Sequence, residues 1–110
     1  MATNYKVLGQ LVPSAPNTYE DVYTVPANTQ SVISTIVVAN LQTVAGAFRI
    51  AVRPAGATLS NEHHIAYDVA LAASDSTTLT LGLTLDASDV VTVRADLDTV
   101  AFSLFGSEIS

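Results

Sequence analysis

An alternation of apolar and polar residues runs through the second half of the chain, from Val69 to Ser110. It is plainest in Thr78–Leu85, where leucine occupies every second position. Successive side chains of a β-strand point to opposite faces, so a period of two gives one face to a core and the other to solvent. The pattern therefore predicts a protein made mostly of half-buried strands.

Eight segments meet the criteria for a strand, separated by turn-forming residues about every dozen positions, as in a sandwich or barrel. Seven of them cover residues 5–12, 19–25, 32–41, 46–53, 64–71, 90–95 and 100–105, and the eighth opens at Asp75 and Ser76 and ends at Leu85. At 110 residues the chain has the length of one domain with one modest core.

The pattern also predicts which side chains face the core. Residues 32–41 contain Ile33, Ile36, Val37 and Val38 nearly side by side, which favours a central strand buried on both faces. The further inward positions that we expect are Phe48, Ile50 and Val52 in one strand, Ile65, Tyr67, Val69 and Leu71 in the next, and the leucines from Leu79 to Leu85 after that.

Eight short strands in one domain fit either an eight-stranded jelly roll or an immunoglobulin-like sandwich. The chain lacks the Cys pair and the Trp of antibody domains. We therefore predict an all-β, single-domain antiparallel β-sandwich of about eight strands, jelly-roll-like, with the immunoglobulin-like sandwich as the alternative.

The first 18 residues form either an N-terminal arm or an internal edge strand, while residues 19–110 form the sandwich. Pro13 and Pro16 separate the first two strands and prevent continuous ladder pairing between them. An arm lying across a neighbouring subunit would bury five apolar residues between subunits. These candidate interface residues are Tyr5, Val7, Leu8, Leu11 and Val12.

Ten acidic residues against four basic ones give a net charge of −6. This balance argues against nucleic-acid and anionic-membrane partners, which are bound mainly by cations. Only 13% of the residues are charged, compared with about 25% in typical soluble domains. Much of the surface must then be neutral and polar, or covered by a neighbour. The sequence shows neither a signal peptide nor an apolar run of membrane-spanning length, so we expect a soluble product made in the cytoplasm.

Residues with catalytic or metal-binding chemistry are few. His63 and His64 are adjacent and would point to opposite strand faces, which favours ordinary loop or strand-edge roles over metal binding or pH sensing. The acids Asp86, Asp89, Asp96 and Asp98 lack the dense spacing of a calcium loop, and turn formation explains them more simply. Because no nucleophile motif is present, we expect no enzymatic activity, no cofactor and no metal.

Two of the four cations, Arg49 and Arg53, share the outer face of one predicted strand. Asp68 on the next strand could lie opposite them, in a cross-strand ion pair worth under ~1 kcal/mol at an exposed site. The alternative is that both arginines contact an acidic surface of a partner. The sequence leaves both interpretations open.

Several segments resemble small virion structural proteins of tailed bacteriophages, cyanophages especially. The resemblance lies in residues 5–10, 35–40, 48–57 and 105–109 together with the leucine-rich strand. It implies a capsid decoration (cement) protein on the virion surface that binds the major capsid protein of the phage head, commonly as a homotrimer. It carries no enzymatic motif.

Two other functions remain open from the sequence. A small tail component, such as a fibre, baseplate or adaptor protein, would share the same resemblance. A carbohydrate-binding module is the third hypothesis, with Tyr5, Tyr19, Tyr23 and Tyr67 as the candidate stacking residues because the chain has no Trp.

Overall fold

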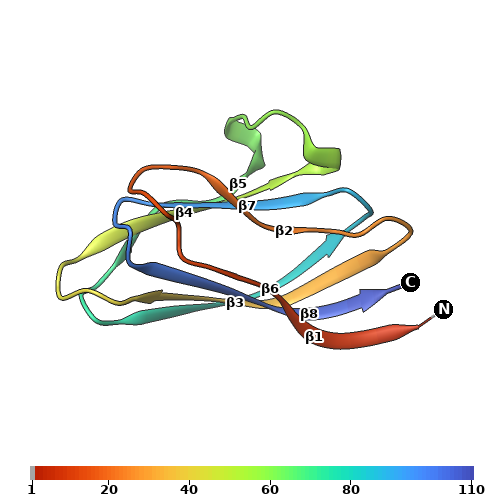
Figure 1. Ribbon diagram of the computed structural model, residues 1–110, viewed down its shortest axis with the longest axis horizontal. Helices are drawn as coiled ribbons and strands as arrows, with labels where there is room; N and C mark the ends of the chain where they lie inside the picture. The colour runs from red at the N-terminus through yellow and green to blue at the C-terminus, as the bar shows by residue number, and fades with distance from the viewer. Residues whose placement is uncertain (1) are drawn as a thin grey trace.

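Two four-stranded antiparallel sheets pack face to face in the computed structural model, which describes residues 2–110 (Figure 1). The strands are β1 (Thr3–Leu11), β2 (Glu20–Thr24), β3 (Gln30–Asn40), β4 (Gly46–Arg53), β5 (His64–Leu71), β6 (Ser76–Leu85), β7 (Val90–Ala95) and β8 (Val100–Ile109). Two short 3-10 turns, η1 (Pro54–Gly56) and η2 (Asn61–His63), interrupt the connection from β4 to β5. Each predicted strand is present, with small differences at its ends.

The order of the strands is that of a jelly roll. One sheet has the order β1-β8-β3-β6 and the other has the order β2-β7-β4-β5. The chain folds back between β4 and β5, and the resulting double ribbon wraps around itself. This produces four strand pairs, β1–β8, β2–β7, β3–β6 and β4–β5. The predicted jelly-roll-like sandwich is confirmed, and the strand order differs from that of an immunoglobulin-like sandwich.

Both ends of the chain lie at the same end of the sandwich (Figure 1). Ala2 and Ser110 exchange two backbone hydrogen bonds, of 2.7 and 2.9 Å. Next to these two hydrogen bonds, β1 pairs with β8 from Thr3 to Leu11. In this structure the first strand is therefore an edge strand in the sheet of its own chain.

The core lies between the two sheets and is almost entirely aliphatic. At its centre Phe48 of one sheet meets Phe102 of the other, edge to face, with ring centroids 6.2 Å apart. Around this pair lie fully buried residues from both sheets, including Ile33, Ile36, Val38, Ile50, Val91, Val93 and Leu104. The inward positions predicted for β4 and β6 pack against this core.

A β-bulge at Ser34 corrects one prediction for β3. This strand is central, as predicted, because it lies between β8 and β6. It is not buried on both faces, since Val37 is only partly buried while Ile33, Ile36 and Val38 are fully buried. The register shifts between Ile33 and Thr35, so two residues three positions apart both face the core.

A second bulge exchanges the inward and outward positions in the first half of β5. Phe48 pairs with Val69 but Ile50 pairs with Ala66, so β5 contains one extra residue there, and Asp68 has a φ of 50°. Val69 and Leu71 face the core as predicted. The inward prediction for Ile65 and Tyr67 is wrong, because before the bulge the alternation is inverted and these side chains are 44% and 55% exposed.

Substitution of Phe102 by alanine tests the core directly. Phe102→Ala removes the ring that joins the two sheets, so we expect a loss of about 3–5 kcal/mol in the free energy of unfolding, measured by urea denaturation. Phe105→Ala is the matched control, because Phe105 lies on the same strand but is only partly buried. Its loss should be less than about half as large, and equal losses would contradict this description of the core.

Candidate functional site

The outer faces of the two sheets have opposite characters. Three of the four cations of the chain, Arg49, Arg53 and Arg94, lie on strands of the β2-β7-β4-β5 sheet. The outward positions of the other sheet carry neutral side chains. Each face is therefore a separate candidate for binding.

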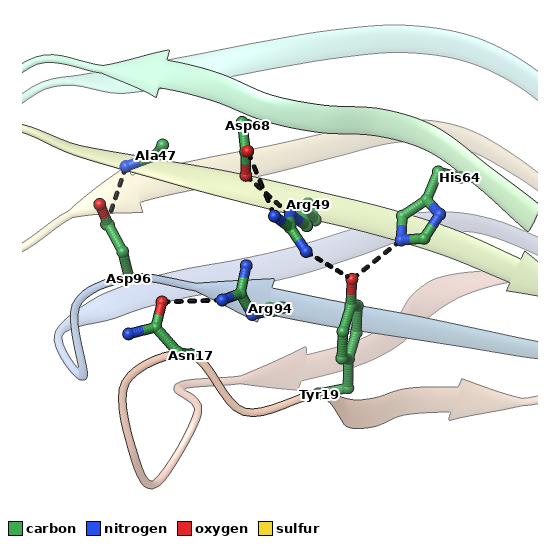
Figure 2. Close-up of polar contacts among 8 residues, drawn as sticks. All are labelled: Asn17, Tyr19, Ala47, Arg49, His64, Asp68, Arg94 and Asp96. Atoms are coloured by element: carbon green, nitrogen blue, oxygen red, sulfur yellow. Dashed lines mark hydrogen bonds and ion pairs between the residues drawn. The ribbon is translucent and has the colours of Figure 1, made fainter. Parts of the chain in front are cut away.

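A polar and aromatic cluster lies on the outer face of the β2-β7-β4-β5 sheet, which we call the charged sheet (Figure 2). We call it the Arg49–Arg94 cluster, and it consists of Tyr19, Arg49, His64, Tyr67, Asp68 and Arg94. The register places Arg49 of β4 directly opposite Arg94 of β7. Asp68 comes from β5 on the other side of β4, and Tyr19 immediately precedes β2.

Arg49 is held on three sides. Its Nε and Nη2 donate to the two carboxylate oxygens of Asp68 at 2.7 and 3.2 Å, and its Nη1 donates to the Tyr19 hydroxyl at 3.0 Å. Its guanidinium carbon lies 3.9 Å from the centroid of the Tyr67 ring, a cation–π distance. Of the two interpretations that the sequence left open for Arg49, the structure contains the cross-strand pair with Asp68. The hydrogen bonds from Arg49 lower the pKa of Asp68.

The Tyr19 hydroxyl connects Arg49 with His64, as Figure 2 shows. Because arginine only donates, this hydroxyl accepts from Arg49 and its own hydrogen is free for His64 Nε2 at 2.9 Å. His64 Nδ1 then carries a hydrogen and faces the Asn61 carbonyl oxygen at 3.3 Å. His63 instead accepts from the backbone N–H of Ser60 at 3.1 Å. The two histidines have separate local roles.

Arg53 is also used inside the chain. Its Nη2 donates to Asp21 at 2.9 Å, its Nε donates to Thr92 at 3.0 Å, and its Nη1 donates to the carbonyl oxygens of Gly56 and Ala57. These bonds hold the η1 segment near β2. With its carboxylate partner in place, Arg53 has little capacity left for an acidic partner surface.

The outer face of the β1-β8-β3-β6 sheet is the second candidate surface, and we call it the uncharged face. Three rows of paired residues cross it from β1 to β6. They are Tyr5–Ser107–Val32–Thr84, Val7–Phe105–Thr35–Thr80 and Gln10–Ser103–Val37–Thr78. None of these twelve positions holds Asp, Glu, Lys, Arg or His.

A groove crosses the uncharged face, lined mainly by Tyr5, Val7, Val32 and Phe105. Tyr5 is 86% exposed and Val7 is 47% exposed, and together with Val32 and Phe105 they form a contiguous apolar patch, a feature typical of interaction sites. Lys6 also lines the groove, and its ammonium group is paired with Glu108 at 3.1 Å.

The structure separates the candidate interface residues of the first strand into two groups. Tyr5 and Val7 are exposed on the uncharged face, and Val12 is exposed just beyond β1. Leu8 packs in the core of its own chain and Leu11 packs against that core, because the strand alternates and Leu8 sits in a bulge opposite β8. On the outer surface the candidate interface therefore consists of Tyr5, Val7 and Val12.

A buried polar network joins the two sheets near the chain ends. The Tyr23 hydroxyl of β2 donates to Glu108 of β8 at 2.6 Å and accepts from Ser31 of β3, also at 2.6 Å. Burial raises the pKa of Tyr23 to about 12. The hydrogen bond from Tyr23 lowers the pKa of Glu108. Tyr23 is thus a structural residue and no stacking platform for a sugar.

The four loop aspartates lie at opposite ends of β7, so they cannot converge on one ion. Asp86 and Asp89 belong to the turn before β7, where Asp89 accepts the backbone N–H groups of Ala55 and Asp86 at 2.8 Å each. Asp96 follows β7 and accepts from the Ala47 N–H (Figure 2). Among residues 2–110, no three His, Asp or Glu side chains gather closely enough to hold a metal ion.

Comparisons with known proteins give a likeness in shape only. No family model matches the sequence, and no curated protein matches it. A structure of the infectious bursal disease virus Gt strain aligns with a TM-score of 0.47 and 9% identity, over 96% of this chain and 31% of that chain. The Gx strain gives a TM-score of 0.43 and 10% identity, over 97% and 30% of the two chains.

This chain spans only about a third of the length of those viral chains. At such TM-scores the likeness carries no argument about function. Within residues 2–110 there is no helix with the length and apolar character needed to cross a membrane.

Sequence reasoning missed Arg94 and the link between Tyr23 and Glu108. The alternation in residues 90–95 places Arg94 on the other face of the strand from the buried Val91 and Val93. Its outward orientation could therefore have been predicted from the sequence. Its position facing Arg49 depends on β4 pairing with β7, which no local pattern indicates.

Glu108→Gln tests the buried network through the pH dependence of stability. Because the folded protein lowers the pKa of Glu108, its ionised form stabilises the fold above the usual glutamate pKa, and this contribution is lost as pH falls through the lowered pKa. At pH 7 the variant should lose about 1–3 kcal/mol of unfolding free energy. Chemical denaturation from pH 7 to pH 3 should show this difference shrinking.

Asp98→Asn is the control for that experiment, because it makes the same charge change at an exposed loop residue. Its stability should follow that of the natural protein at each pH. A deficit of Glu108→Gln that stays constant down to pH 3 would contradict the charged hydrogen bond.

Proposed function

We propose that this protein is a non-enzymatic structural protein of a tailed-phage virion. In this proposal it decorates the outside of the head and reinforces the shell by bridging neighbouring copies of the major capsid protein. The uncharged face carries the proposal.

The composition of the uncharged face suits a surface that another protein covers. Burying an ionised side chain in an interface costs desolvation energy, and no ionised side chain occupies the three rows that cross this face. The exposed Tyr5 and Val7 of β1, with the neighbouring Phe105 of β8, supply the aromatic and apolar contacts typical of interface cores. The surrounding threonines and serines keep the free protein compatible with water.

The sequence resemblance to phage virion proteins gives the class of partner. A decoration protein binds many equivalent sites on a shell, so modest contacts are strengthened by repetition. A homotrimer would match a local threefold position of the lattice.

A binding assay with phage heads that lack the protein tests this proposal. The added protein should sediment with the heads and raise the temperature at which they release DNA. Tyr5→Asp combined with Val7→Asp places two carboxylates on the uncharged face, and we expect head affinity to fall at least about tenfold. Sedimentation over a range of protein concentrations measures that affinity.

Leu41→Asp is the matched control, because Leu41 is 64% exposed in the loop after β3 and lies off the uncharged face. It should bind heads like the natural protein. Heads that gain no heat resistance would overturn the cement role, and a few dozen copies located on the tail would favour the tail alternative instead.

A further inference from the structure

Two arginines face each other across neighbouring strands of the charged sheet. Arg49 of β4 and Arg94 of β7 are paired in register. Like charges directly opposite one another in a sheet are destabilising. Asp68 neutralises Arg49 through two hydrogen bonds, and it lies on the β5 side, away from β7. Asp68 also interacts with Arg94 at longer range, so one carboxylate faces two arginines and one positive charge remains.

Arg94 stands apart from the other cations of the chain. Lys6, Arg49 and Arg53 each have a carboxylate partner, at 3.1, 2.7 and 2.9 Å. In the described part of the chain Arg94 forms no such ion pair, and its Nη2 donates instead to the side-chain oxygen of Asn17 at 2.9 Å (Figure 2). A chain with ten acids and four bases thus leaves one arginine without a carboxylate.

We propose that Arg94 binds a carboxylate side chain of a protein partner. A guanidinium group has five N–H donors in a planar fork that matches a carboxylate, and the bond to Asn17 leaves most of them free. The centroid of the Tyr19 ring lies 5.7 Å from the Arg94 guanidinium carbon, so the neighbouring side chain on that side is uncharged. The ligand that we propose is an acidic segment of a protein.

Exposed apolar side chains on β5, one of them in the cluster, give the partner more to contact. Tyr67 is 55% exposed and Ile65 is 44% exposed, both because the bulge at Asp68 turns them outward. Arginine and tyrosine are enriched among the residues that dominate binding energy in protein interfaces. The Arg49–Arg94 cluster combines an unpaired cation with such aromatic surface.

The charge of the whole chain favours a protein over a polyanion. Nucleic acids and anionic membranes present many negative charges, and the net charge of −6 would repel them. One carboxylate, in contrast, matches the single excess positive charge at Arg94. This site lies on the sheet opposite the uncharged face, so the inference does not rest on the proposed function.

A peptide titration followed by NMR tests the inference. The probe is the blocked acidic peptide Gly-Asp-Leu-Glu-Gly, and its amide-matched control is Gly-Asn-Leu-Gln-Gly. At low salt and pH 7 the acidic peptide should produce saturable shifts at the Arg94 side chain and at the rings of Tyr19 and Tyr67. The amide peptide should bind at least about tenfold more weakly.

Two variants locate the binding at Arg94. Arg94→Gln should weaken the acidic peptide at least about tenfold, while Lys6→Gln makes the same charge change on the other sheet and should leave binding unchanged. Asn17→Asp leaves Arg94 intact but gives it a carboxylate within the chain, next to the atom that now accepts its hydrogen bond. Asn17→Asp should therefore abolish peptide binding and raise the melting temperature.

Three results with the peptides would overturn the inference. They are equal binding of the acidic and amide peptides, undiminished binding by Arg94→Gln, and undiminished binding by Asn17→Asp. Inorganic phosphate is the remaining probe. If the shifts at Arg94 saturate at a lower concentration of phosphate than of peptide, Arg94 is a general anion site. That result would overturn the assignment to a protein carboxylate.

Discussion

Burial of the aliphatic faces of both sheets in one shared interior is the interaction on which the rest of the structure depends. Phe48 and Phe102 meet at its centre, and the strands around them contribute only one face each. Because strands alternate their side chains, every buried face leaves an outer face with a composition of its own. Here the wrapping of the chain gives neutral rows to the β1-β8-β3-β6 sheet and arginines to the other sheet.

This division gives the molecule two different candidate binding surfaces on opposite sides. The uncharged face suits broad contact with another protein, since no ionised side chain occupies its three rows and the Lys6 ammonium at the groove is already paired with Glu108. The opposite face has most of its charges neutralised inside the chain, as Arg49 with Asp68 and Arg53 with Asp21 show. Among the lysine and arginine side chains of residues 2–110, Arg94 alone has no carboxylate partner, and we propose that it binds an external one. A protein that joins neighbouring parts of an assembly needs such separate surfaces.

The sequence predicts the strands and much of the core, because a period of two is a local property. It also indicates the pair of Arg49 and Asp68 as one of two interpretations, since these residues lie on consecutive strands. The bulges at Ser34 and Asp68 could not be predicted, because one extra residue in a strand leaves no local signature. The contact of Tyr23 with Glu108 depends on how distant strands meet, which requires the fold itself.

Hydroxyl-radical footprinting of the protein, free and bound to phage heads, tests the central claim most directly. It measures how far each side chain is accessible to solvent in the two states. The uncharged face should become covered, so oxidation of Tyr5 and Phe105 should fall several-fold on heads while oxidation of Leu41 stays the same. If Tyr5, which is 86% exposed in the free chain, stays equally reactive on heads, the uncharged face does not contact the shell and the account is wrong.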